Sequence, residues 1–343
     1  MKNLIYQFPR KNLKHGKVVS TMLLLFAILC LLAPYESYAG QWVEMSSGTD
    51  KYLWSVWGSS PNDVYAVGND GTILHFDGNQ WSKIDEGFSG SLQGVWGSSA
   101  NDVFVVGNRG TVLHFDGNEW STQTSRGSGA NLNDIWGFSS SDVFAVGSYL
   151  AGENYEAYIV RYNGNQWTEV YSGVYDYFNF VWGSSATDLF IGGTDEPVMT
   201  YFIAHYNGIN ASTMLTGDSL PANGFWGSSG SNVFAVGANA SLQGVIYQYN
   251  GNFWSEMTQS PFSNYLMSVW GRSENDVYAV GDGGIILHYD GNEWTQMSSG
   301  TPERLNDVWG FPEGDIFAVG DGGTILHYTE HTMPWIPLLL LDD

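Results

Sequence analysis

The sequence predicts an all-β fold, a seven-bladed β-propeller of four-stranded antiparallel blades. Two observations predict it: a segment of about 40 residues recurs seven times, and each copy divides into four short apolar runs. The recurrence is plainest in "VWGSSPNDVYAVGNDGTILHFDGNQW" (56–81), which returns as "VWGSSANDVFVVGNRGTVLHFDGNEW" (95–120). Repeats of this period are typical of propellers and solenoids, so the repeat region is expected to form one domain.

A tryptophan in a "[VIF]WG" triplet marks each copy. The seven tryptophans are Trp57, Trp96, Trp136, Trp182, Trp226, Trp270 and Trp309. The first copy contains the runs "LWSVWG", "DVYAVG", "GTILHF" and "NQWSKI", separated by turn residues such as Asp77-Gly78. Short runs joined by Asp-Gly or Asn-Gly turns are antiparallel strands. Because the runs are apolar on both faces, stacked blades around an axis are favoured over a linear β-solenoid, whose coils are usually shorter.

The first and last copies are incomplete in complementary ways. The segment "GQWVEMSSGTDKYLW" precedes the first triplet and matches "GNEWTQMSSGTPERLNDVW" before the last triplet. Trp42 therefore begins a fourth strand that has no first three strands before it, whereas the last copy lacks its fourth strand. We expect the N-terminal strand to complete the last blade and to close the ring.

Two aromatic positions recur within the copies. Six of the seven predicted fourth strands carry a tryptophan that we expect in the core: Trp42, Trp81, Trp120, Trp167, Trp254 and Trp294. Five histidines share one position in the predicted third strand, and Arg161 and Gln248 occupy it in the other two copies: His75, His114, His205, His288 and His327. A catalytic base is needed once, so a histidine repeated around the ring indicates a structural hydrogen bond to a turn Asp or Ser.

The ends of the chain differ from the repeats. Residues 1–39 combine five basic residues, an apolar run and small residues at Ser37 and Ala39, which predicts a secretory signal peptide cleaved after Ala39. An uncleaved membrane anchor is the alternative. We expect residues 40–330 to form the propeller and 331–343 to form a short apolar tail that cannot span a bilayer. The expected location is secreted or periplasmic, with no membrane span in the mature form.

The charge balance limits the partners and cofactors. The whole chain has a formal net charge of −23, and removal of the predicted signal peptide leaves 34 acidic and 7 basic residues. Nucleic acid and anionic membranes are poor partners for such a surface.

The mature chain has no cysteine, so disulfides are excluded. The acidic turns suggest Ca²⁺ as an incidental ligand, although no Asp-x-Asp-x-Gly loop is present, and we expect no other cofactor. We expect a monomer.

The unit "DVYAVG…ILHFDGNQW" resembles a kelch-type blade, in which a β-run that ends in glycine precedes an aromatic residue, a turn and a tryptophan. The copy "LFIGGTDEP" even carries the double glycine. The period and Trp-Gly content also resemble WD-repeat and other secreted bacterial propellers, from Trp42 to about Tyr328. The "WD" dipeptide and the "SxDxGxTW" box are absent. The resemblance implies a fold and not a substrate, because such folds host binders, scaffolds and enzymes.

The first candidate site lies where the repeat is broken. Copies three to five lengthen the connection between their second and third strands, which should emerge on the same face as the link into the next copy. Several aromatic and acidic residues are expected on one sector of this face: Tyr149, Tyr155, Tyr175, Tyr177 and Phe178, with Asp176, Glu153, Asp195 and Glu196. Exposed aromatics beside acids suit a protein hot spot or a sugar. The alternative is that these aromatics pack beneath their own loops.

The second candidate site is the mouth of the axial channel. The residue three positions before each anchor tryptophan should face the axis: Trp54, Gln93, Asn133, Asn179, Asn223, Met267 and Asn306. The next position holds Ser55, Gly94, Asp134, Phe180, Gly224, Ser268 and Asp307. This partly polar ring is interpreted as solvated channel lining or as a site for a small ligand or ion.

We expect an exported, non-enzymatic binding or scaffold propeller that recognises a protein partner through the face with the long loops of copies three to five. A carbohydrate-binding lectin that uses the same aromatics is the alternative. A glycoside hydrolase or lyase that uses the carboxylates Asp134 and Asp307 at the axis is a third hypothesis. The repeats contain no unique histidine, no cysteine and no His pair at i, i+4 for a metal.

Overall fold

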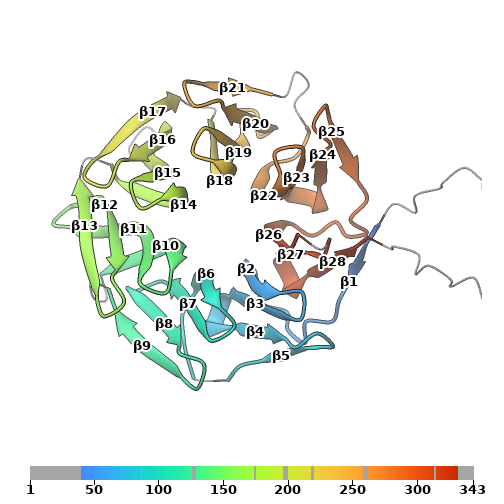
Figure 1. Cartoon of the computed structure of the whole chain (residues 1–343), viewed down its shortest axis with the longest axis horizontal. Helices are drawn as coiled ribbons and strands as arrows, with labels where there is room; N and C mark the ends of the chain where they lie inside the picture. Colours follow the sequence, from blue (N-terminus) through green and yellow to red (C-terminus); the bar gives the residue numbers. More distant parts are fainter. Residues whose placement is uncertain are drawn as a thin grey trace, which may run out of the picture. The chain divides into compact units, whose positions relative to one another are not determined.

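The computed structural model describes residues 40–330, except 86, 126–128, 174, 196–199, 218–219, 258–261 and 313. The expected signal peptide (1–39), the expected tail (331–343) and Glu196 lie outside the described residues. Residues 40–330 form one compact unit, in which seven four-stranded antiparallel sheets surround a central axis (Figure 1). The predicted seven-bladed all-β propeller is confirmed.

In blades 1 to 6 the strands follow one another from the axis outwards in chain order. Blades 1 and 2 comprise β2 (Leu53–Ser60), β3 (Asp63–Gly68), β4 (Ile73–Phe76), β5 (Trp81–Lys83), β6 (Leu92–Ser99), β7 (Asp102–Gly107), β8 (Thr111–Phe115) and β9 (Trp120–Thr124). Blades 3 and 4 comprise β10 (Ala130–Ser139), β11 (Asp142–Ala151), β12 (Asn154–Tyr162), β13 (Trp167–Gly173), β14 (Tyr177–Ser185), β15 (Asp188–Asp195), β16 (Thr200–Tyr206) and β17 (Ala211–Gly217). Blades 5 and 6 comprise β18 (Leu220–Ser229), β19 (Asn232–Ala238), β20 (Gly244–Tyr249), β21 (Trp254–Glu256), β22 (Leu266–Ser273), β23 (Asp276–Gly281), β24 (Ile286–Tyr289) and β25 (Trp294–Met297).

Blade 7 combines the two ends of the described chain. It consists of β26 (Leu305–Gly310), β27 (Ile316–Gly320), β28 (Ile325–Thr329) and β1 (Gln41–Glu44). The strands β1 and β28 pair in an antiparallel register with Trp42 opposite Tyr328, and the two ring centroids lie 5.3 Å apart. Trp42 is buried at this position. The N-terminal strand therefore completes the last blade, as the sequence predicts.

The "WG" pair of each inner strand joins neighbouring blades. At five junctions the indole of one blade covers the glycine of the next blade so closely that a β-carbon on the glycine would lie 2.5–2.8 Å from the ring. These pairs are Trp57 with Gly97, Trp96 with Gly137, Trp182 with Gly227, Trp226 with Gly271 and Trp270 with Gly310. At the other two junctions the indole N–H donates to the glycine carbonyl, from Trp136 to Gly183 (3.0 Å) and from Trp309 to Gly58 (3.2 Å). We call this chain of contacts the Trp–Gly relay, and it passes through the junction of blades 7 and 1.

The fourth-strand tryptophans pack against the preceding blade. Five of the six rings lie 5.9–6.3 Å from an aromatic ring of its second strand, in the pairs Trp81–Phe317, Trp120–Tyr65, Trp167–Phe104, Trp254–Phe190 and Trp294–Phe234. Blade 4 has Ala211 at this position. There Arg161 of blade 3 replaces the repeated histidine and places its guanidinium 5.2 Å from the ring centre of Phe144. The arginine therefore covers the ring on which a histidine stacks in blades 1, 2, 6 and 7.

The repeated histidine bonds an aspartate of the second strand. In five blades the Nε2 atom lies 2.7–2.8 Å from the Asp carboxylate, and Arg161–Asp142 and Gln248–Asn232 replace this pair in the other two blades. Ser59 donates its hydroxyl hydrogen to Asp63 and not to His75. The serine and the histidine therefore do not form the nucleophile–base pair of a hydrolase. Burial tends to raise the pKa of Asp63, but hydrogen bonds from His75 and Ser59 outweigh it, and the pKa is lowered. The predicted structural role of the histidines is confirmed.

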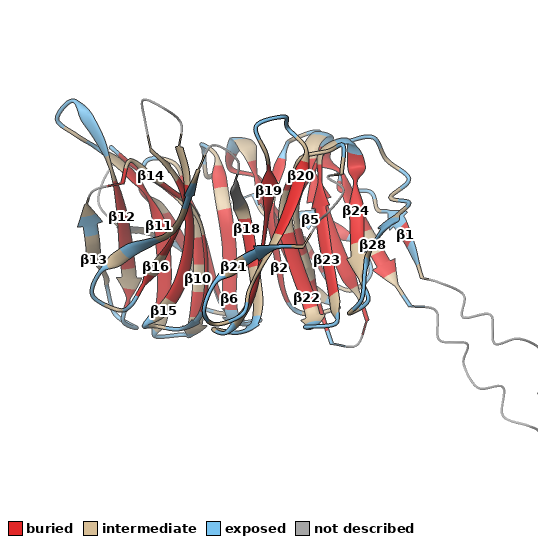
Figure 2. Ribbon diagram, turned by 90° about the horizontal axis from the view of Figure 1, so that it is seen from above, coloured by how far each residue is buried: buried red, intermediate tan, exposed pale blue. Residues whose placement is uncertain are grey.

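Burial follows from this stacking. The inner and middle strands are buried on both faces, whereas the hairpins and outer strands are exposed (Figure 2). Burying one tryptophan removes about 200 Å² from water and gains about 5 kcal/mol before chain entropy is counted. The core of the protein is therefore a set of interfaces between blades, and each blade depends on both neighbours.

A chain that begins at Tyr52 lacks β1 and leaves blade 7 with three strands. We expect it to be less stable than the chain that begins at Gly40, by about 3–5 kcal/mol from the loss of Trp42 alone. Thermal unfolding followed by circular dichroism measures the difference. Val43→Ala in the same strand is the control, since Val43 is 57% exposed. Equal unfolding temperatures for the two chain lengths would show that ring closure contributes nothing.

The Trp–Gly relay predicts that one methyl group damages a blade junction. Gly137→Ala places a β-carbon 2.6 Å from the ring of Trp96, and we expect a loss of about 1–3 kcal/mol in the free energy of unfolding. Gly129→Ala in the preceding link is the matched control, because no atom lies within 4 Å of its β-carbon. Denaturant titration compares the two variants, and an equal effect of both substitutions would sink the prediction.

Candidate functional site

The candidate site is a pocket on the propeller axis. Inner strands of all seven blades line it, and its cavity volume is about 110 Å³. The register of blade 3 pairs Ala130, at the start of β10, with Tyr149, near the end of β11. The starts of the inner strands therefore lie on the same face as the β11–β12 hairpin. We call this face the hairpin face.

A β-bulge in each inner strand forms the mouth of the pocket. In six blades one residue is left out of the pairing with the second strand: Trp54, Gln93, Asn133, Asn179, Met267 and Asn306. In β18 the irregular stretch 221–223 includes Asn223. Bulges re-aim a side chain locally, which explains how these residues come to face the axis. All the predicted mouth residues except Gly94 and Asn179 line the pocket.

The mouth asparagines also connect the blades. The side-chain amides of Asn133 and Asn223 donate to the backbone carbonyls of Phe178 (2.8 Å) and Leu266 (3.0 Å) in the next blade. Asn306 donates in the same way to Leu53 (2.9 Å), across the junction that closes the ring. Three mouth residues therefore hold neighbouring inner strands in register, in addition to lining the pocket.

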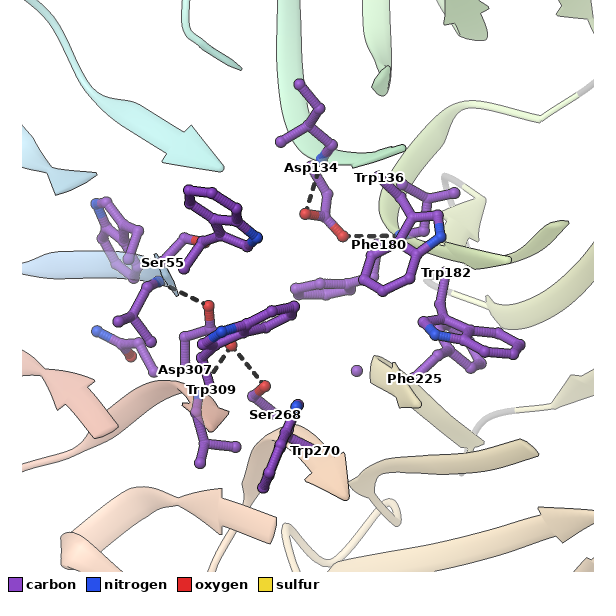
Figure 3. Close-up of a pocket in the computed structure, with 18 of the residues that line it drawn as sticks. Ser55, Asp134, Trp136, Phe180, Trp182, Phe225, Ser268, Trp270, Asp307 and Trp309 are labelled. Atoms are coloured by element: carbon purple, nitrogen blue, oxygen red, sulfur yellow. Dashed lines mark hydrogen bonds between the residues drawn. The ribbon is translucent and has the colours of Figure 1, made fainter. Parts of the chain in front are cut away.

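Two carboxylates lie just inside the mouth, on blades 3 and 7 (Figure 3). Asp134 accepts backbone N–H bonds from Ile135 and, in the next blade, Val181, both at 2.8 Å. Asp307 accepts the N–H of Val308 and, in blade 1, that of Val56, both at 2.9 Å. Each carboxylate therefore bridges two blades while one side of it faces the pocket.

Burial perturbs both carboxylates. Loss of solvent raises the pKa of Asp134 to about 7, although two backbone N–H bonds favour its charged form. Burial also raises the pKa of Asp307, against hydrogen bonds from Ser268, Val56 and Ser55. The negative charge of Asp307 adds to the shift at Asp134, so the two acids interact electrostatically across the pocket. At neutral pH part of the population carries a proton on Asp134.

The predicted loop-face residues divide into exposed and buried groups. Tyr155 is 41% exposed, and its ring lies 4.9 Å from the half-buried ring of Tyr177. Tyr175 and Phe178 are buried, so the expectation that they form an exposed surface is wrong. Tyr175 stacks on Phe202 at 4.4 Å because the long link into blade 4 folds back over its own sheet. For these two rings, packing beneath the loop is the correct interpretation.

The polar members of the same set form local bonds. The hydroxyl of Tyr149 donates to Glu156 at 2.5 Å in the adjoining strand, which holds the β11–β12 hairpin. The backbone N–H of Asp176 donates to Asp195 at 3.1 Å. Glu153 is exposed near the tip of the hairpin. Glu153 and Asp176 therefore lie in the same hairpin and link as Tyr155 and Tyr177.

Two further aromatic features of the hairpin face were not predicted. The 47% exposed ring of Tyr52 stacks on Trp54 at 6.1 Å, and the Trp54 indole donates to Asn69 at 2.8 Å. Burial and a hydrogen bond with Tyr201 raise the pKa of the Tyr265 hydroxyl to about 12. Tyr52, Tyr177 and Tyr265 each stand two residues before a mouth residue. Comparison of this position across the repeats could have revealed them.

The basic side chains are mostly committed to ion pairs. Among the described residues, Lys51, Arg161, Arg272 and Arg304 pair with carboxylates. The described part of the chain contains no group of three or more His, Cys, Asp or Glu that could hold a metal ion. No helix among the described residues is long and apolar enough to cross a membrane. Because the described basic side chains are few and mostly paired, the surface of the propeller offers many uncompensated carboxylates.

The raised pKa of Asp134 predicts a stability that depends on pH. The folded protein binds this proton more tightly than the unfolded chain, whose aspartates titrate near pH 3.9. The stabilisation of the folded state by the proton on Asp134 is therefore complete below about pH 4 and is lost as the pH rises through about 7. We expect Asp134→Asn to flatten the decline in unfolding temperature between pH 5 and 8. Asp85→Asn, at an exposed link residue, is the control, and parallel profiles for all three proteins would contradict the prediction.

No protein-family model matches the sequence, and no curated protein matches it. Solved structures are similar in fold. A structure described as YCF48 bound to D1 peptide has a TM-score of 0.65 and 16% identity, and the match covers 84% of this chain and 97% of that chain. The WD40 propeller domain of Doa1 has a TM-score of 0.65 and 13% identity over 86% and 98% of the two chains. YCF48 from Cyanidioschyzon merolae has a TM-score of 0.65 and 15% identity over 84% and 99%. At these identities the likeness shows the propeller fold.

Proposed function

We propose that the chain is a non-enzymatic binding propeller that recognises a protein partner through its hairpin face. The observation that carries the proposal is the β11–β12 hairpin, which projects from the ring with its residues exposed (Figure 2). Leu150 is 54% exposed beside the tip, and Tyr155 is 41% exposed. Tyrosine is one of the residues enriched in protein-binding hot spots.

The surroundings of the hairpin favour a cationic protein segment. Glu153 stands at the tip, and Asp176 and Asp195 lie at the base of the neighbouring link. Electrostatic complementarity would attract a segment rich in lysine or arginine and would exclude acidic partners. A propeller of this fold has been described with a bound peptide, and this supports a peptide-binding role for this chain.

We also propose that the protein meets this partner outside the cytoplasm, on the evidence of residues 1–39. Sugar binding is the second candidate, and the observation that favours it is the stacked Tyr52–Trp54 pair beside Gln93 and Asn69. A hydrolase centred on Asp134 and Asp307 has less support, because both carboxylates are engaged by backbone N–H groups.

Selection of peptides from a random display library, in parallel with a glycan array, tests the proposal. We expect basic peptides to be selected and their affinity to fall at least about tenfold in the double variant Leu150→Ser, Tyr155→Ala. Phe253→Ala is the matched control, because this ring is 61% exposed in a hairpin between the third and fourth strands of blade 5. Specific glycan binding without peptide binding would establish the lectin instead. Equal affinities of both variants for the peptides would show that the hairpin is not the binding surface.

A further inference from the structure

We propose that the axial pocket is a subsite for one guanidinium group, an arginine side chain that the partner inserts through the mouth on the hairpin face. This inference rests on the proposed function, because it names the group that a partner docked on that face would present. It draws on the lining of the pocket, on the bonding capacity of its two carboxylates and on one unsatisfied atom at its mouth.

The pocket combines acidic and aromatic groups without any cation. Asp134 and Asp307 reach into it from blades 3 and 7, and Phe180, Trp136 and Trp309 lie between and around them (Figure 3). Among the described residues that line the pocket, the two carboxyls are the only ionisable groups, and none is a lysine or arginine. A guanidinium is a planar cation that stacks on aromatic rings and forms several hydrogen bonds at once, so it matches this lining.

Asp134 retains unused hydrogen-bonding capacity. A carboxylate oxygen has two lone pairs, and each oxygen of Asp134 accepts a single backbone N–H bond. Asp307 is more fully bonded, because Oδ1 accepts from Ser268 (2.6 Å) and Val308 (2.9 Å), Oδ2 accepts from Val56, and Ser55 also bonds the carboxylate. Asp134 can therefore accept further bonds from a donor in the pocket, whereas Asp307 contributes its negative charge. The five N–H donors of a guanidinium can reach carboxylates on two sides, whereas an ammonium offers three.

The buried charges have no counterion within the described chain. Buried carboxylates are costly unless they are paired, and these two are held by N–H and hydroxyl donors alone. Four of the six described basic side chains already form ion pairs outside the pocket, and the other two, Lys83 and Arg109, do not line it. Apart from a proton on Asp134, a compensating cation would therefore have to come from another molecule.

The mouth provides an independent indication of a missing donor. The side-chain oxygen of Asn306 is buried and has no hydrogen-bond partner in the described part of the protein, and the residue is 6% exposed. Buried acceptors in native proteins are rarely left unsatisfied. Asn306 lies at the mouth next to Asp307, so an inserted guanidinium would bring N–H donors to this edge of the pocket.

The test compares acetyl-arginine amide with acetyl-citrulline amide, which has nearly the same shape and no charge. Calorimetric titration of the protein is expected to show saturable binding of the arginine probe only. Asp134→Asn and Asp307→Asn should each weaken this binding at least about tenfold. Glu119→Gln should leave it unchanged, because Glu119 is exposed in the hairpin between β8 and β9. Equal binding of the two probes, no binding of either probe, or full binding to both Asn variants would overturn the proposal.

A second measurement uses the unaltered protein, in case the Asn variants fold poorly. Because a proton on Asp134 removes one charge from the pocket, the affinity for the arginine probe should fall between pH 8 and pH 5. A flat pH profile would contradict the proposal. The double variant Leu150→Ser, Tyr155→Ala separates the two proposals, since it should weaken peptide binding at least about tenfold and leave binding of the small probe intact. If the probe binds in the expected way and no peptide does, the subsite stands and the proposed hairpin surface is wrong.

Discussion

The structure depends on one contact repeated around the ring, the packing of an indole from one blade onto the glycine of the next. Each "WG" pair serves two junctions, because its tryptophan reaches forward while its glycine accepts the tryptophan from behind. The contact allows no β-carbon in five of the seven junctions. It also places seven large rings near the axis, so the same residues that hold the blades together form the walls of the axial pocket.

The candidate site follows from this arrangement. The relay fixes the inner strands close together, and a bulge in each strand turns one side chain into the mouth. Asn133, Asn223 and Asn306 then bond the next blade, as do Asp134 and Asp307 one position later. Binding capacity and stability are therefore combined in the same side chains. A group that enters the pocket would act on residues that already hold blades 3, 4, 7 and 1 together.

Much of the fold could be predicted from the sequence because it is repeated. Seven triplets predict seven blades, and the unpaired strand at Trp42 predicts closure against Tyr328. The recurrence of His75 and its equivalents predicts a structural bond, which the pairs with Asp63 and its equivalents provide. The mouth ring could also be located, although the bulges that turn these residues towards the axis leave no mark in a single sequence.

The surface of the hairpin face was less predictable, because its residues break the repeat. Spacing could place Tyr155 and Tyr175 on one sector, but whether a ring in a long link faces solvent depends on how that link folds back. Tyr175 is buried against Phe202, and Tyr155 remains exposed. The exchange of a fourth-strand tryptophan for Ala211 and of a histidine for Arg161 was visible in the sequence, yet the contact of Arg161 with the ring of Phe144 is apparent only in the structure.

The most direct test of the Trp–Gly relay is a double-mutant cycle at the junction of blades 2 and 3. The free energy of unfolding is measured for the unaltered chain, Trp96→Ala, Gly137→Ala and the combination. If the indole alone forbids a β-carbon at Gly137, the cost of Gly137→Ala should nearly vanish once Trp96 is truncated, with a coupling of about 1 kcal/mol or more. Additive costs would show that the glycine is required for another reason and that the relay does not join the blades.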